Sequence, residues 1–124
     1  MTVHLDTSAL VGALTGPRES FARLRQLVDA GHRPKLSTVV LYEWLRGLRS
    51  VSERRTQEEL FPRDAAVPFD AQAADRAATL YAELPRARGR DLDLAIAACA
   101  LVHDAALWTL NPKDFGDVPG LKLL

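Results

Sequence analysis

The sequence predicts a three-layer α/β domain in which helices flank a mainly parallel central sheet. Short apolar runs alternate with longer segments of helical periodicity, a pattern typical of βαβ units. The clearest unit lies between Gly89 and Phe115, where an alanine-rich helix is followed by the apolar run Ala105–Leu110. This run is too short for a helix and contains Trp108, so we expect a buried strand. Parallel strands need crossovers of this kind.

The first half of the chain is expected to supply two strands and four helices. Strands are predicted over residues 2–5 and 35–36, and helices over 7–14, 18–30 and 39–48. The pair Gly16-Pro17 should end the first helix, and Gly31 should form the C-cap of the second. The charged stretch 50–60 is interpreted as a surface helix or as one arm of a helical hairpin.

The second half should complete the sheet. Residues 66–69 are predicted to form a third short strand, which Pro68 places at the edge or at the strand's end. Asp70 should cap an amphipathic helix that runs to Leu84 and carries Tyr81 on its apolar stripe. A basic loop over 85–90, the helix–strand unit and a last strand over 120–124 follow. Nothing divides the chain, so residues 1–124 are expected to form one domain.

The overall composition is that of an ordinary globular protein. Sixteen basic and sixteen acidic residues cancel, so a polyanion would have to be held by a local patch. The single cysteine, Cys99, cannot form an internal disulfide and should be a small buried residue, which fits a reducing cytosol. We see neither a secretory leader nor an apolar run near the ~20 residues of a membrane span. We therefore expect a cytoplasmic protein with no membrane contact.

Two acidic residues in the first half can be explained in more than one way. Asp6 directly follows the first strand, where it could be a helix N-cap or a carboxylate at a strand's carboxyl end. Glu43 interrupts a largely apolar helical strip. There it must be paired with a neighbour such as Arg46, protonated, or bound to a cation, because burying a lone charge costs several kcal/mol.

The acidic residues of the second half divide in the same way. Asp91 and Asp93 are two positions apart, so on a helix they point in roughly opposite directions. Asp93 is expected to face inward, because Ile96 lies one turn further along, and Asp91 is the better N-cap candidate. Asn111 and Asp114 are turn residues by default.

Taken together, these residues predict one acidic site at the sheet edge where parallel strands end. Packed carboxylates repel one another, and a hard divalent cation such as Mg²⁺ or Mn²⁺ relieves that repulsion through oxygen ligands. Such a site suits phosphodiester hydrolysis, since the metal polarises the phosphate and lowers the pKa of the attacking water. The three histidines show no zinc-binding spacing.

Four segments in order resemble the PIN-domain family, specifically the VapC-type toxin ribonucleases of toxin–antitoxin modules. They are LDTSAL, STVVLYEWLRG, DLAIAACAL and WTLNPKDF with PGLKLL after it, and together they span nearly the whole chain. The resemblance implies a PIN-like fold, RNA cleavage by an endonuclease, homodimerisation and neutralisation by a VapB-like antitoxin.

The resemblance also assigns roles to individual residues. Asp6, Glu43 and Asp93 match the acidic metal site, with Asp6 and Asp93 as the most direct Mg²⁺ ligands. Thr7, Ser8 and Thr109 would support this site. The family's fourth acidic position is Asn111 here, which leaves Asp114 to take its place directly or through water.

Three arginines beside the acidic site form the candidate RNA-binding patch. Arg86, Arg88 and Arg90 flank Asp93 and could hold phosphates, or they could be ordinary solvated charges. Two other functions stay open at this point. One is a PIN nuclease of RNA maturation or DNA flaps, and the other is a catalytically inactive PIN-fold module that binds a protein partner.

Overall fold

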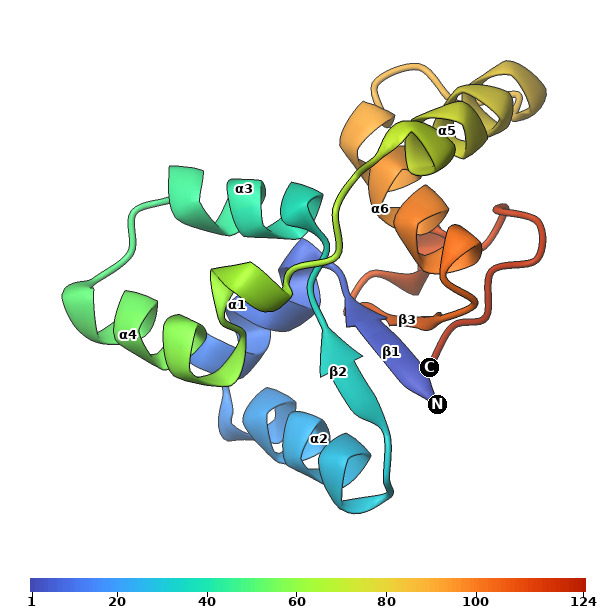
Figure 1. The fold of residues 1–124 in the computed structure, drawn as a ribbon. Helices are drawn as coiled ribbons and strands as arrows, with labels where there is room; N and C mark the ends of the chain where they lie inside the picture. Colours follow the sequence, from blue (N-terminus) through green and yellow to red (C-terminus); the bar gives the residue numbers. More distant parts are fainter.

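The computed structural model describes all residues from 1 to 124 and has a three-stranded parallel sheet at its centre. The strands are β1 (Thr2–Leu5), β2 (Arg33–Lys35) and β3 (Ala106–Trp108), in the order β2-β1-β3 (Figure 1). The first strand is thus central, and β2 and β3 pair with it on either side. This arrangement confirms the predicted α/β fold with a parallel sheet.

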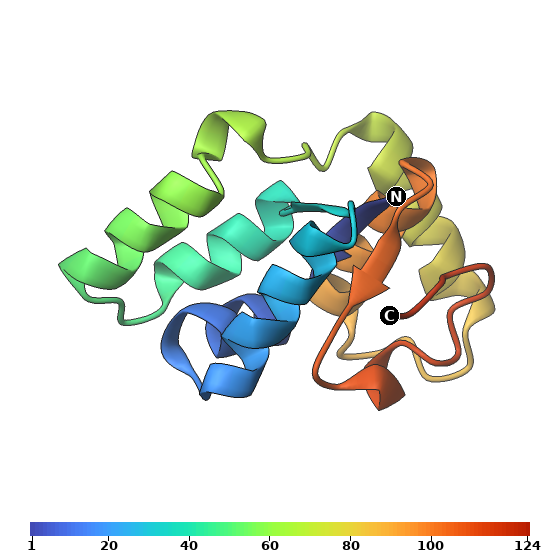
Figure 2. The ribbon, with the colours of Figure 1, turned by 90° about the horizontal axis from the view of Figure 1, so that it is seen from below.

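Six helices cover this sheet in two groups. They are α1 (Thr7–Thr15), α2 (Arg18–Asp29), α3 (Thr38–Arg46), α4 (Val51–Leu60), α5 (Ala71–Glu83) and α6 (Asp91–Val102), with short 3₁₀ turns η1 (Arg63–Ala65) and η2 (Pro112–Asp114). The first four pack together on one side of the sheet, and α5 and α6 lie on the other (Figures 1 and 2). None of these helices has the length and apolar character needed to cross a lipid bilayer.

The strands predicted over residues 66–69 and 120–124 are wrong, because each segment forms only an isolated bridge. Residues 66–69 contribute a single bridge, between Val67 and Ser37, and Pro68 has no N–H to continue the pairing. Residues 120–124 likewise make one bridge, between Leu123 and Leu107. Both segments therefore extend the sheet by one residue pair on each edge.

Helix boundaries agree with the sequence pattern except at one end. The third helix ends at Arg46 and not at residue 48, because Gly47 adopts an extended conformation (φ −76°, ψ 166°). The charged stretch 50–60 is a helix, and a capping box between Ser50 and Glu53 fixes its start. The φ of Gly31 is +89°, which fits its predicted position just after the second helix.

The sixth helix is the most buried helix, and it packs against α5, α3 and β3. Seven consecutive residues, Leu94–Ala100, are buried, so the helix is covered on all sides. Most of these side chains are alanines, which let the sheet and α5 approach closely. Burial raises the pKa of the Cys99 thiol to about 11, so this cysteine belongs to the core as predicted.

One buried polar side chain in the sheet has no partner. His4 on β1 is 1% exposed, and neither ring nitrogen has a hydrogen bond. Burial, with smaller contributions from the charges of His103 and Lys35, lowers its pKa from 6.5 to about 4. The native protein therefore keeps this imidazole neutral.

His4 should make stability depend on pH. Between about pH 6.5 and pH 4, His4 is protonated in the unfolded chain but stays neutral in the folded protein. The stability that comes from neutral His4 is therefore complete above pH 6.5 and is lost as the pH falls towards 4. The loss amounts to roughly 3 kcal/mol over that interval. In His4→Phe, the unfolding free energy measured in urea should fall less steeply between pH 7 and pH 4.5. An equally steep fall in both proteins would contradict this account.

Candidate functional site

The carboxylate of Asp6 anchors the site at the carboxyl end of the central strand. This side chain is 5% exposed, and its Oδ1 accepts hydrogen bonds from the Ala9 backbone N–H (2.8 Å) and the Ser8 hydroxyl (2.7 Å). Its Oδ2 accepts one from Thr109 Oγ1 at 2.5 Å. Asp6 is thus the N-cap of α1 and also a buried carboxylate at the sheet edge. Both roles considered for Asp6 from the sequence, helix N-cap and carboxylate at a strand's end, are therefore present at once.

Thr109 and Ser8 tie the neighbouring strand end to the same point. The Asp6 backbone N–H donates to the carbonyl of Trp108, which is the last residue of β3. Ser8 Oγ accepts from the Leu110 N–H, and Thr109 Oγ1 accepts from the Asn111 N–H. The predicted supporting residues therefore hold the loop after β3 against the start of α1.

Glu43 reaches the site from the third helix. Its Oε1 accepts from Thr7 Oγ1 at 2.6 Å, and its Oε2 pairs with Arg46 at 3.2 Å. The side chain is 15% exposed, whereas that of Arg46 is 52% exposed, so the pair is open to solvent on one side. Thr7 follows Asp6 directly, and it therefore couples this glutamate to the first acidic residue.

Asp93 lies in the first turn of the sixth helix, half-buried beside the other acids. Its pKa is raised, chiefly by burial and then by the negative charges of Asp114, Glu43 and Asp6, while Arg90 lowers it. Residues that are distant in the sequence are thus close enough to repel this carboxylate. Glu43 and Asp6 are therefore near enough to Asp93 to act on it electrostatically.

Asp91 does not have the capping role predicted for it. It is exposed and is already the first helical residue, and Arg90 occupies the N-cap position without a side-chain cap bond. As the first residue inside the helix, Asp91 lies one position past the N-cap, where a side chain would accept from the N–H groups of the first turn. Asp91 therefore contributes negative charge to the first turn of the helix and makes no capping hydrogen bond.

The loop after β3 supplies a fourth acidic residue. Asp114 ends the turn η2 and is the largest charge contribution to the raised pKa of Asp93. Asn111 precedes that turn and is exposed. Of the two, Asp114 is the one that acts electrostatically on Asp93.

Arg90 is held by the protein itself. Its guanidinium makes two hydrogen bonds of 2.8 Å to the Asp117 carboxylate, another of 2.8 Å to the Asp114 carbonyl and one of 3.3 Å to the Arg86 carbonyl. These bonds lower the pKa of Asp117 and fix the loop that carries Asp114 beside the sixth helix. Sequence reasoning missed Asp117, and a lone aspartate after a turn gives no signal of this pairing.

Two of these carboxylates, Asp6 and Asp93, have oxygen atoms of the kind that a hard cation such as Mg²⁺ uses as ligands. Asp6 Oδ2 has one acceptor position left beside its bond from Thr109, and the repulsion at Asp93 is of the kind that a cation relieves. No group of three or more acidic, histidine or cysteine side chains is close enough together to hold an ion by itself. Mg²⁺ typically takes one or two protein carboxylates along with waters and substrate phosphate.

Asp93→Asn should stabilise the protein near neutral pH. Ionising Asp93 is unfavourable in the native state, so its contribution to stability falls as the pH rises through its raised pKa. The variant should melt at a higher temperature than the wild type at pH 7.5 in EDTA. The gap should close at acidic pH, where Asp93 binds a proton. A lower melting temperature at pH 7.5 would show that Asp93 is not repelled.

Thr109→Val should destabilise the protein without changing its shape. Valine fills the same volume, but it leaves the buried Asp6 Oδ2 and the Asn111 N–H without their partner. The expected cost is about 1–3 kcal/mol of unfolding free energy. Thr15→Val removes a hydroxyl bonded to a helix carbonyl on the exposed surface, and it serves as the control. Equal effects of the two changes would contradict the role of Thr109.

Known proteins are similar to this chain in sequence and in fold. The chain matches the PIN domain family over residues 3–121. It is 32% identical over 124 residues to "Ribonuclease VapC19" of Mycobacterium tuberculosis, covering 95% of each chain. Among solved structures, it is similar to a toxin–antitoxin complex from Klebsiella pneumoniae (TM-score 0.74, 26% identity, 98% of this chain and 95% of that chain). It also resembles VapBC2 from Rickettsia felis, solved with a promoter DNA fragment (TM-score 0.80, 24% identity, 100% and 98%).

The sequence match and the shared fold agree with the resemblance seen in the sequence motifs. The chain belongs to the PIN-domain family, and within it to the VapC type.

Proposed function

We propose that this chain is a Mg²⁺-dependent endoribonuclease that acts as the toxin of a toxin–antitoxin pair. The observation that carries the proposal is the half-buried carboxylate of Asp93 near the ends of the parallel strands, whose pKa is raised first by burial and then by the charges of Asp114, Glu43 and Asp6. The 32% identity to a relative named a ribonuclease supports the choice of RNA as substrate.

Each acid has a distinct part in this proposal. Asp6 and Asp93 would hold Mg²⁺, with Mn²⁺ as a substitute, and Asp114 would bind directly or through water. The ion, when bound, polarises the scissile phosphate and lowers the pKa of the attacking water. Glu43 is fixed by Thr7 and Arg46, so it can accept a proton from that water in a defined orientation.

Two arginines beside these acids are free to hold the RNA backbone. Arg86 and Arg88 are exposed and take no part in the three ion pairs of the structure. Arg90, by contrast, is committed to Asp117, so we assign it the positioning of the Asp114 loop in place of the phosphate contact.

A protein partner has a suitable surface on the other side of the molecule. A groove of about 370 Å³ between α2 and α4 is lined mainly by apolar side chains, and Phe21, Val28 and Leu60 are each about half exposed there. Such a patch suits an apolar peptide segment. We propose that a VapB-like antitoxin covers this groove, and that the toxin forms a homodimer.

Asp93→Asn should abolish RNA cleavage while Asp91→Asn leaves it intact. Both changes remove one charge from the same helical turn, but Asp93 is the half-buried residue on which Asp114, Glu43 and Asp6 act, whereas Asp91 is exposed and is not a proposed metal ligand. The measurement is Mg²⁺-dependent cleavage of an RNA panel by the purified proteins. In cells, the wild type should arrest growth and Asp93→Asn should not. If Asp91→Asn is inactive and Asp93→Asn is active, the site has been assigned to the wrong aspartate.

Titration with Mn²⁺ separates the proposal from its two alternatives. An inactive interaction module should show no saturable site by calorimetry, whereas the proposed nuclease should show one that Asp93→Asn weakens. A processing nuclease would bind the metal equally well but would not arrest growth when expressed alone.

A further inference from the structure

A pocket of about 540 Å³ joins the acidic site to an exposed tyrosine. It lies between α3, the end of α5 and the start of α6, and its lining includes Glu43, Tyr81, Arg88 and Asp93. We propose that this pocket binds one unpaired RNA nucleotide next to the scissile phosphate, with its base stacked on Tyr81 and its phosphate on Arg88. This inference rests on the proposed nuclease function.

Tyr81 is more exposed than its position in the sequence pattern predicts. The sequence puts it on the apolar stripe of α5, yet its side chain is 47% exposed, while its neighbour Leu80 is 2% exposed. A base can cover a half-exposed aromatic ring at little cost in free energy, and the face of the ring can stack on any of the four bases. Unpaired bases of RNA are commonly recognised by stacking of this kind.

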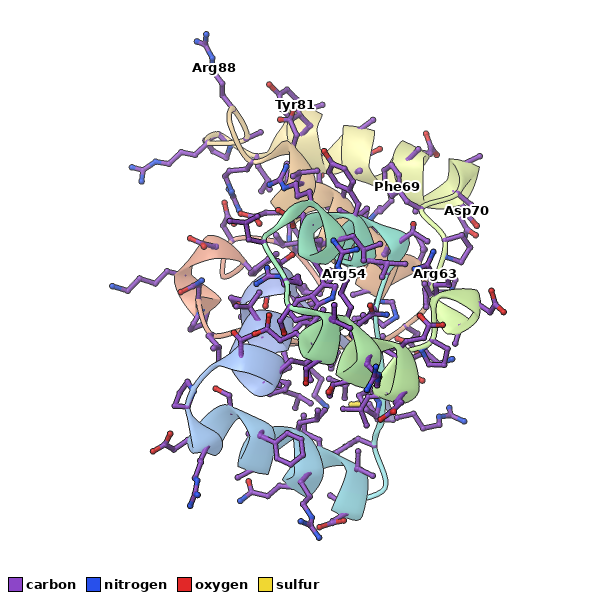
Figure 3. The ribbon with its side chains drawn as sticks, turned by 90° about the vertical axis from the view of Figure 1, so that its left-hand side faces the viewer. Arg54, Arg63, Phe69, Asp70, Tyr81 and Arg88 are labelled. Atoms are coloured by element: carbon purple, nitrogen blue, oxygen red, sulfur yellow. The ribbon has the colours of Figure 1, made fainter.

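Arg88 supplies the positive charge that the pocket otherwise lacks. The pocket contains Glu43, Asp91 and Asp93, which repel a phosphate, and Arg90 is already paired with Asp117. Arg88 takes part in none of the ion pairs, and Figure 3 shows its side chain extending from the loop near Tyr81. The free guanidinium at the edge of this pocket can therefore hold a backbone phosphate.

The size and walls of the pocket suit a single nucleotide. A volume of about 540 Å³ lies in the range of small-ligand sites, and the lining is mostly polar. Two of the lining residues, Glu43 and Asp93, are proposed catalytic acids, so a nucleotide held here is adjacent to the bond to be cut. A base-paired nucleotide has its faces covered by its neighbours and cannot stack on Tyr81. The pocket thus selects single-stranded RNA.

Abasic substitution in the RNA tests the stacking contact directly. An oligoribonucleotide with one cleavage site is prepared in versions that each lack one base near the cut. For the wild type, one such version should raise KM about tenfold with little change in kcat, as expected for the loss of one stacked base. Tyr81→Ala should raise KM for the intact RNA by a similar factor and become insensitive to that missing base. Tyr81→Phe, which keeps the ring, should behave like the wild type.

Two exposed residues outside the pocket provide matched controls. Phe69→Ala removes a partly exposed aromatic ring just before the start of α5, at the opposite end of this helix from Tyr81, and Arg63→Ala removes an exposed arginine of η1; neither residue lines the pocket (Figure 3). Neither should change KM, whereas Arg88→Ala should weaken RNA binding and lower its salt dependence by about one counterion. Melting temperatures of all variants check that they fold.

The outcomes distinguish this inference from the function on which it rests. If the wild type cleaves RNA but no abasic position matters, or if Tyr81→Ala still senses the missing base, the nucleotide pocket is disproved and the nuclease assignment stands. If the wild type cleaves no RNA with Mg²⁺ or Mn²⁺, the proposed function falls and this inference falls with it.

Discussion

The hydrogen bonds to the carboxylate of Asp6 are the interaction on which fold and site both depend. Through Ala9 and Ser8 this group starts the first helix, and through Thr109 it joins the end of β1 to the end of β3. An unfilled N-cap would cost the helix about 1 kcal/mol, so the residue is useful to the fold even without a ligand. The same bonds hold the carboxylate rigidly and leave one acceptor position on Oδ2.

The acidic residues around Asp6 destabilise the folded state, because their negative charges repel one another. Asp93 is half-buried among like charges, and its raised pKa measures how unfavourable that placement is. Helix N-termini and Arg90 compensate in part, because the helix dipole and a nearby guanidinium both favour negative charge. The fold thus tolerates a strained electrostatic arrangement that a divalent cation would relieve, which is typical of functional sites.

The molecule has two separate surface hollows with different linings. The polar pocket with Tyr81 and Arg88 opens beside the acids, whereas the apolar groove between α2 and α4 involves none of them. A charged RNA backbone and an apolar peptide would therefore meet different surfaces. In the proposed toxin, substrate and antitoxin need not compete for the same side chains.

The elements that depend on local apolar periodicity could be predicted from the sequence. Features that depend on contacts between distant residues could not. The parallel sheet and the buried sixth helix follow from the short apolar runs and the helical apolar spacing. Tyr81 shares its helical stripe with buried Leu80, and only the position of neighbouring elements shows that its ring is exposed. Similarly, the contact between Arg90 and Asp117 joins residues 27 positions apart, so no spacing rule indicates it.

The account can be tested most directly by anomalous diffraction from crystals soaked in Mn²⁺. It predicts one strong peak in contact with Asp6 Oδ2 and the carboxylate of Asp93, with Glu43 and Asp114 nearby. A peak elsewhere on the surface, or none at this edge of the sheet at saturating Mn²⁺, would contradict it.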